Sequence, residues 1–167
     1  MRLAASVLTV ALLGAGLGCS SSNASSGNDA GDPAADSSTP DGAGVVSCDD
    51  PREQTYTPGM QQAGASGVFT FVLMSSTPAP PADDSNVFVL EVLDTSGQPV
   101  TGATITVKPT MPTMSHGTST VTVTSNPDGS YTLDPLYFFM GGLWQVAIHA
   151  TSGSQSDTTS FFFCVAG

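Results

Sequence analysis

From residue 67 onward, apolar and polar positions alternate with a period of two, and Val, Thr, Phe and Tyr are frequent. Alternation of this kind is typical of β-strands with one buried face, and the segment lacks helix signals. The pattern predicts seven strands, which are Val68–Met74, Val87–Leu93, Ala103–Pro109, Ser119–Thr124, Ser130–Leu133 continuing into Leu136–Phe139, Leu143–Ala150 and Thr158–Val165. Seven short strands with no helices predict an all-β, antiparallel sandwich.

The alternation also indicates which side chains form the core. Glu91 is polar and marks the outer face of its strand, as Gln145 and His149 do for theirs. The inward positions are therefore Phe88, Leu90 and Val92 in one strand and Trp144, Val146 and Ile148 in another. Burial of Trp144 would stabilise the fold by about 2–3 kcal/mol by area alone, provided that its indole N–H finds an acceptor.

The first 18 residues have the character of an export signal. Arg2 precedes an apolar run over residues 3–17, which is shorter than the roughly 20 residues of a membrane span and predicts a secretory signal peptide. The next sequence, Gly16-Leu17-Gly18-Cys19-Ser20, resembles the lipobox of bacterial lipoproteins. That resemblance implies lipidation of Cys19 and attachment to a membrane, and Ser20 in place of aspartate favours the outer membrane where a cell has one. The alternative is a soluble exported protein in which Cys19 has no role.

Residues 19–47 differ in composition from the rest of the chain. They consist almost wholly of Ser, Asn, Ala, Gly, Asp and Pro, so they contain little that could be buried to offset the entropy of ordering. We expect a flexible tether that lets a lipid-anchored domain stand off the membrane surface. The folded domain is expected to occupy residues 48–167.

The chain is strongly acidic. Removal of the signal peptide takes away Arg2 and leaves Arg52 and Lys108 against fourteen acidic residues, a formal charge of −12. Nucleic-acid binding is excluded as a function, because no basic patch is available to neutralise phosphates. Half of the acids precede residue 60, so much of the charge belongs to the tether and the domain entry and is interpreted as solvation.

With Cys19 assigned to lipid, two cysteines remain. Cys48 and Cys164 lie at the two ends of the predicted domain, and an oxidising compartment favours a disulfide between them over metal ligation. In the chain-entropy model, closing a loop of this length stabilises the fold by about 4–5 kcal/mol.

The segment Met111-Pro112-Thr113-Met114-Ser115-His116-Gly117 places two thioethers and one imidazole within six residues. Apart from Met1 the chain has five methionines, and it has two histidines, so this concentration does not follow from a Met-rich composition. Soft sulfur ligands beside an imidazole suit Cu(I). The two nearby prolines keep the loop out of a helix and favour an open turn.

This loop occurs together with three other landmarks: the run Asp94-Thr95-Ser96-Gly97-Gln98-Pro99-Val100-Thr101-Gly102-Ala103, the turn Asp128-Gly129-Ser130-Tyr131, and Phe139-Met140-Gly141-Gly142-Leu143-Trp144. In this combination, residues 85–150 resemble the YtkA-like (FixH-like) domain family. The resemblance implies an immunoglobulin-like β-sandwich in exported or membrane-associated bacterial proteins, some of them associated with copper handling. The resemblance supports an inference of fold better than an inference of a defined activity.

A copper site would combine the two landmarks that contain methionine. Met111, Met114, His116 and Met140 form a possible three- or four-coordinate set, provided that the turn at Met140 lies at the same end of the sandwich as the loop. Trp144 would then lie against the cation. In the alternative interpretation the methionines plug the end of the sandwich, with Met140 the one most expected to belong to the core, and His116 bonds to backbone.

Catalysis finds little support, because the sequence lacks a phosphate-binding glycine loop, a zinc motif and a convincing nucleophile and base pair. The sequence therefore predicts a lipoprotein of the cell envelope that binds or transfers Cu(I) and is not an enzyme. The alternative is a structural or interaction module, without metal, that docks on another envelope protein.

Overall fold

The computed structural model describes residues 48–114, 116–117 and 120–167, with the backbone alone described at His116. The predicted signal peptide (1–18), the lipidation site Cys19 and the tether (19–47) lie outside the described residues. Within the described residues, no helix long and apolar enough to cross a membrane is present.

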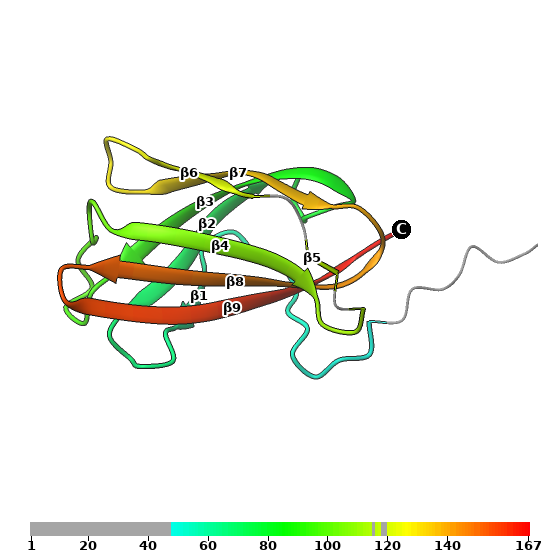
Figure 1. Ribbon diagram of the computed structural model, residues 1–167, viewed down its shortest axis with the longest axis horizontal. Coiled ribbons are helices and arrows are strands. Elements are labelled where there is room, and N and C mark those ends of the chain that lie inside the picture. The colour runs from blue at the N-terminus through cyan, green and yellow to red at the C-terminus, as the bar shows by residue number, and fades with distance from the viewer. Residues whose placement is uncertain (1–47, 115, 118–119) are drawn as a thin grey trace, which may run out of the picture. The chain divides into compact units, whose positions relative to one another are not determined.

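The described residues form two antiparallel sheets, which confirms the predicted β-sandwich (Figure 1). The five-stranded sheet has the order β1 (Met60–Ala63), β2 (Thr70–Thr77), β3 (Asp84–Leu93), β7 (Tyr131–Phe138) and β6 (Thr122–Ser125). The four-stranded sheet has the order β5 (His116–Gly117), β4 (Thr104–Met111), β8 (Gly142–Ser152) and β9 (Gln155–Val165).

Two of these nine strands, β1 and β5, are absent from the sequence prediction. The sequence of β1, Met-Gln-Gln-Ala, has no β-branched or aromatic residue, and it is a strand because all four residues pair with β2. β5 is two residues long and lies opposite the end of β4. The two segments predicted around residues 130–139 form the single strand β7, and Pro135 is accommodated where the register between β3 and β7 shifts.

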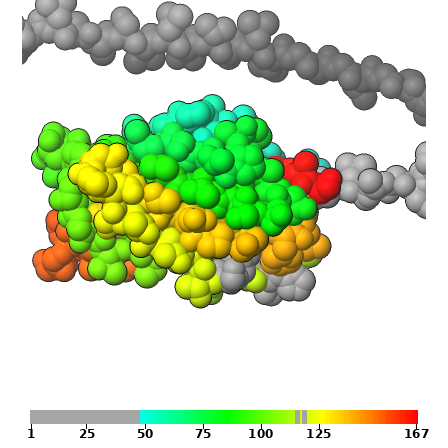
Figure 2. All heavy atoms as spheres, turned by 90° about the horizontal axis from the view of Figure 1, so that it is seen from above, coloured from blue at the N-terminus to red at the C-terminus, as the bar shows by residue number. Residues whose placement is uncertain are grey.

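The core lies between the two sheets, as the alternation predicts. Six inward positions are fully buried, which are Phe88, Leu90 and Val92 of β3 and Trp144, Val146 and Ile148 of β8. Figure 2 shows the molecule from the side of the five-stranded sheet, where β3 (green) lies beside β7 (orange). His149 is exposed on the outer face of β8, as expected.

Aromatic rings connect the two sheets across this core. The ring of Phe88 in β3 meets the ring of Phe163 in β9 edge to face, with 5.9 Å between centroids. Phe138 in β7 and Trp144 in β8 approach to 5.0 Å. Such pairs contribute about 0.5–1.5 kcal/mol each beyond the area that they bury, so they help to fix how the sheets stack.

The predicted disulfide is confirmed. Cys48, ahead of the first strand, is bonded to Cys164 near the end of β9, with 5.7 Å between the two Cα atoms. The bond spans 116 residues and therefore closes almost the whole described domain into one loop. Its expected effect is to restrict the unfolded chain.

At the opposite end of β9, the carboxylate of Asp157 is buried and organises the loop between β1 and β2. It accepts hydrogen bonds from the backbone N–H groups of Ser66, Val68 and Phe69 at 2.8–3.0 Å, and from that of Thr158. Burial raises the pKa of Asp157, but these backbone hydrogen bonds outweigh it and the net effect is a lowered pKa. Gly64 lies so close that a Cβ there would overlap the carboxylate.

We predict that Asp157→Asn lowers the free energy of unfolding at pH 7 by about 2 kcal/mol, because an amide cannot accept the same bonds and its NH₂ group faces N–H donors. The lowered pKa means that the carboxylate stabilises the fold above its ordinary pKa of 3.8 and that this contribution disappears as the pH falls below it. The variant should therefore lose less stability than the parent between pH 5 and pH 3. Urea unfolding at pH 7, pH 5 and pH 3 measures these free energies. Glu91→Gln, on the outer face of β3, is the control. Equal stability of parent and Asp157→Asn at pH 7 would contradict the prediction.

Candidate metal site at the disulfide end of the sandwich

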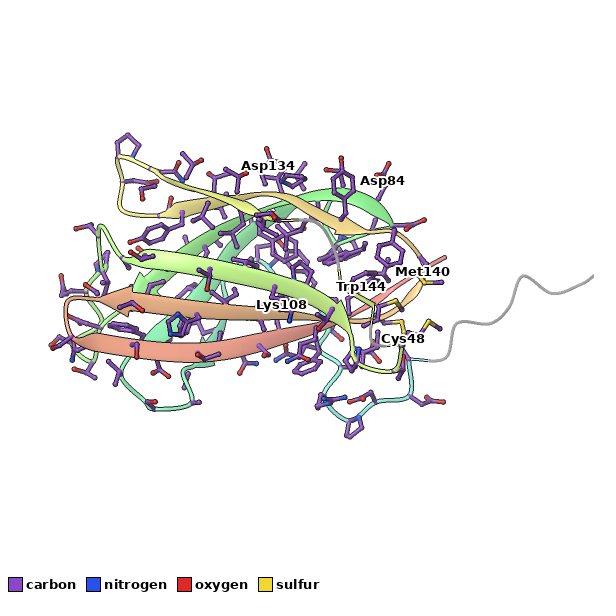
Figure 3. The ribbon with its side chains drawn as sticks, in the orientation of Figure 1. Cys48, Asp84, Lys108, Asp134, Met140 and Trp144 are labelled. Carbon is purple, nitrogen blue, oxygen red and sulfur yellow. A yellow bond between two sulfur atoms is a disulfide. The ribbon has the colours of Figure 1, made fainter. Side chains whose placement is uncertain are left out.

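Strand pairing brings three separate segments together at one end of the four-stranded sheet. β4 and β8 are antiparallel, with Thr110 opposite Gln145, so the loop after β4 lies beside the turn that precedes β8. β9 pairs with the other side of β8, and its residue Cys164 is bonded to Cys48. Figure 3 shows the sulfur atoms gathered at this end, around Met140 and Cys48.

A pocket of about 380 Å³ opens here, and we call it the methionine pocket. Its described lining residues are Cys48, Asp49, Asp50, Met111, Thr113, Met114, Met140, Gly141, Gly142 and Leu143. Three of them are methionines that the sequence singles out, and they come from the end of β4, the loop after it and the turn before β8. The structure therefore brings Met111, Met114 and Met140 to one pocket.

The three methionines differ in depth. Met111 has 2% of its surface exposed and belongs to the core, Met140 is partly buried against the core, and Met114 is 49% exposed. The sequence interpretation named Met140 as the most core-like, whereas the structure gives that place to Met111. The reason is that Met111 ends β4 on the inward face, in line with the buried residues Ile105 and Pro109.

Trp144 fixes the turn on which Met140 lies. The indole N–H donates a hydrogen bond to the backbone carbonyl of Met140 at 3.0 Å, so the acceptor that the sequence analysis required is present. The indole also meets the exposed ring of Phe139 edge to face at 5.1 Å. Trp144 is fully buried, and its observed contacts position the turn that carries Met140.

The two histidines lie on different parts of the four-stranded sheet. His116 lies in β5, and its backbone pairs with Met111 in β4. His149 lines a separate hollow of about 440 Å³ on the outer face of β4 and β8, together with Lys108. This placement agrees with the interpretation of His149 as surface.

Carboxylates lie beside the thioethers in the methionine pocket. Asp50 lines the pocket and is paired with Arg52 through a 2.8 Å ion pair. The side-chain hydrogen bond from Arg52, reinforced by its backbone N–H, lowers the pKa of Asp50 from 3.8 to about 2. The carboxylate of Asp50 is therefore ionised throughout the neutral range, and the guanidinium of Arg52 balances its charge.

Sequence reasoning did not place Cys48, Asp49 and Asp50 at this site, because it assigned the two acids to a solvated domain entry. A signal was nevertheless present. The predicted disulfide ties residue 48 to the end of the last strand, and an antiparallel partner of that strand must begin at the same end of the sheet. The segment after Cys48 therefore has to lie near the turn that carries Met140.

The donor set at this end is dominated by sulfur. In the parts of the chain that the structure describes, no group of three His, Cys, Asp or Glu side chains could hold a metal ion. The residues that do meet in a pocket carry thioethers, which are soft, neutral ligands suited to Cu(I).

The fold and this site define a small antiparallel β-sandwich domain with a sulfur-lined pocket at one end. The chain belongs to the YtkA-like family, whose model matches residues 65–149. All three pocket methionines lie within the matched range, whereas Cys48 and Cys164 lie outside it. No curated protein matches the chain.

Comparison with solved structures finds similar chains at low sequence identity. A DUF4426 family protein from Pseudomonas aeruginosa PAO1 is 15% identical, with a TM-score of 0.48, over 64% of this chain and 96% of its own. FetP from uropathogenic Escherichia coli strain F11 is 10% identical, with a TM-score of 0.46, over 67% of this chain and 96% of its own. A copper-bound variant of FetP is also 10% identical, with a TM-score of 0.44, over 67% and 97%.

Proposed function

We propose that this chain is an exported lipoprotein whose YtkA-like domain binds Cu(I) in the methionine pocket and passes it on within the cell envelope. The observation that carries the proposal is the meeting of Met111, Met114 and Met140, from two separate segments, in one pocket. His116 is a further ligand in this proposal, because its backbone lies opposite Met111. The role is binding and transfer rather than catalysis.

The ligand chemistry supports Cu(I) over divalent ions. Thioethers are uncharged and soft, so they stabilise a soft monovalent cation and offer little to Mg²⁺ or Ca²⁺, which prefer oxygen. They also remain available under oxidising conditions, where Cys48 and Cys164 are tied up as a disulfide.

The gradient of exposure supports transfer as well as binding. Met114 is half exposed and can meet an ion or a partner protein at the surface, whereas Met111 lies inside the core. Met140, partly buried and held by the hydrogen bond from Trp144, lies between these extremes. An ion held at the outer thioether is open to ligand exchange with another soft ligand on a partner.

We predict that the chain binds Cu(I) with at least micromolar affinity, or about 8 kcal/mol, while the disulfide is kept oxidised. Titration against a competing chelator measures this affinity in a chain that carries Cys19→Ser, so that no free thiol competes. Binding should weaken by about tenfold or more in each of the variants Met114→Leu, Met140→Leu and His116→Ala. Leucine keeps the volume of methionine and removes the thioether, and alanine removes the imidazole.

Met74→Leu is the matched control, because Met74 is 44% exposed in β2 and belongs to the other sheet. It should leave the affinity unchanged. Binding weaker than micromolar, or the same loss of affinity in Met74→Leu as in Met114→Leu, would reject the copper-binding proposal. It would favour the alternative of a metal-free interaction module.

The anchoring part of the proposal rests on Cys19, with residues 1–18 as the signal peptide and 19–47 as the tether. We predict that Cys19→Ser moves the protein from the membrane fraction to the soluble fraction of the envelope, because the lipid-bearing thiol is lost. Fractionation and labelling with a fatty-acid analogue provide the measurement. Equal membrane association of parent and variant, without labelling of either, would rule out the lipid anchor.

A further inference from the structure

The disulfide is part of the methionine pocket and does not merely lie near it. Cys48 lines the pocket together with Met111, Met114 and Met140. Its partner Cys164 lines a different hollow of about 180 Å³, formed with residues that include Tyr56. The two cysteines of one disulfide therefore line two different cavities. The sulfur of Cys48 would be a soft ligand for Cu(I) at the wall of the methionine pocket, but the bond to Cys164 masks it.

We propose that reduction of the disulfide between Cys48 and Cys164 releases the Cys48 thiolate into the methionine pocket and converts it into a tighter, thiolate-containing Cu(I) site. This inference rests on the proposed copper function and adds a redox control to it. A thiolate is an anionic soft ligand, so with the thioethers it forms a stronger set for Cu(I) than thioethers alone.

The chemistry requires a dithiol reductant, and the structure favours its attack at Cys164. Cys164 is exposed whereas Cys48 is partly buried. Attack of one reductant thiolate on the sulfur of Cys164 breaks the S–S bond and expels Cys48 as a thiolate. The second thiol of the reductant then attacks the mixed disulfide and releases Cys164, so two electrons pass to the protein and the reductant leaves as a disulfide. The Cys48 thiolate then binds Cu(I) where it would otherwise take up a proton.

Contacts other than the disulfide keep Cys48 beside the pocket after reduction. The backbone N–H of Gln54 donates to the carbonyl of Phe162 at 2.9 Å, and the N–H of Phe162 donates to the side-chain oxygen of Gln54 at 3.0 Å. The guanidinium of Arg52 lies 4.7 Å from the centroid of the Phe162 ring. Asp50, bound to Arg52, donates its backbone N–H to the carbonyl of Cys48 at 2.7 Å. This chain of contacts leads from β9 to residue 48.

Two variants with one thiol each test the proposal, both in the chain with Cys19→Ser. Cys164→Ser leaves the Cys48 thiol and should bind Cu(I) at least about tenfold more tightly than the oxidised parent, with a new thiolate-to-copper absorption in the ultraviolet. Cys48→Ser leaves the Cys164 thiol, which lines the other hollow without the three methionines, and should bind Cu(I) less tightly than Cys164→Ser. Circular dichroism verifies that both variants are folded.

A second substitution shows whether thiolate and thioether hold the same ion. Met114→Leu should weaken Cu(I) binding by about tenfold in the Cys164→Ser background and in the reduced parent. The control Met74→Leu should leave the affinity unchanged in both. The reduced parent, freed of reductant before titration, gives the same comparison if a single-cysteine variant does not fold. Equal affinities of Cys164→Ser and Cys48→Ser, or no effect of Met114→Leu beside a free Cys48, would overturn the proposal.

The outcomes separate this inference from the copper function on which it rests. Micromolar binding by the oxidised parent with no gain in Cys164→Ser would keep the copper function and reject the redox control. Absence of binding by the oxidised parent, with tight and Met114-dependent binding by Cys164→Ser, would reject the thioether-only site and support Cys48 as its required ligand.

Discussion

The antiparallel pairing of β8 with β4 on one side and β9 on the other determines where every feature of the candidate site lies. Because β4 ends where β8 begins, the loop that carries Met114 meets the turn that carries Met140. Because β9 ends at the same point, the disulfide from Cys164 draws Cys48 into the same pocket. Three segments that are distant in sequence thus supply sulfur to one end of the sandwich, and the backbone ladder rather than the loops themselves sets their proximity.

The two ends of the four-stranded sheet serve different purposes. At one end a buried carboxylate, Asp157, satisfies several backbone N–H groups and fixes the loop between β1 and β2. At the other end the chain opens into a pocket whose walls grade from the buried Met111 to the exposed Met114. Hydrogen bonding and core packing at the first end stabilise the fold without involving the pocket.

Much of the fold follows from the sequence, because period-two alternation reports burial directly. The stripe of β8 from Trp144 to Ile148 is buried as predicted, and the cysteine pair at the domain ends is bonded. β1 was missed because Met-Gln-Gln-Ala has no strand signal of its own and depends on its pairing with β2.

The grouping of Met114 and Met140 was only a conditional prediction, since sequence alone does not give the register between β4 and β8. Cys48 was not placed at the predicted site because the two acids that follow it were assigned to a solvated domain entry. The lack of register concealed that Met111, as the last inward residue of β4, is the deepest of the three methionines.

The central claim is that the three thioethers of the methionine pocket bind one ion together, and methyl NMR tests it most directly. In the oxidised chain with Cys19→Ser and isotope-labelled methionine methyl groups, one equivalent of Cu(I) should shift the signals of Met111, Met114 and Met140 together. The signals of Met60 and Met74, which lie in the five-stranded sheet, should stay in place. Equal shifts of Met114 and Met74 with none at Met140, or no shift at any methionine, would contradict the account.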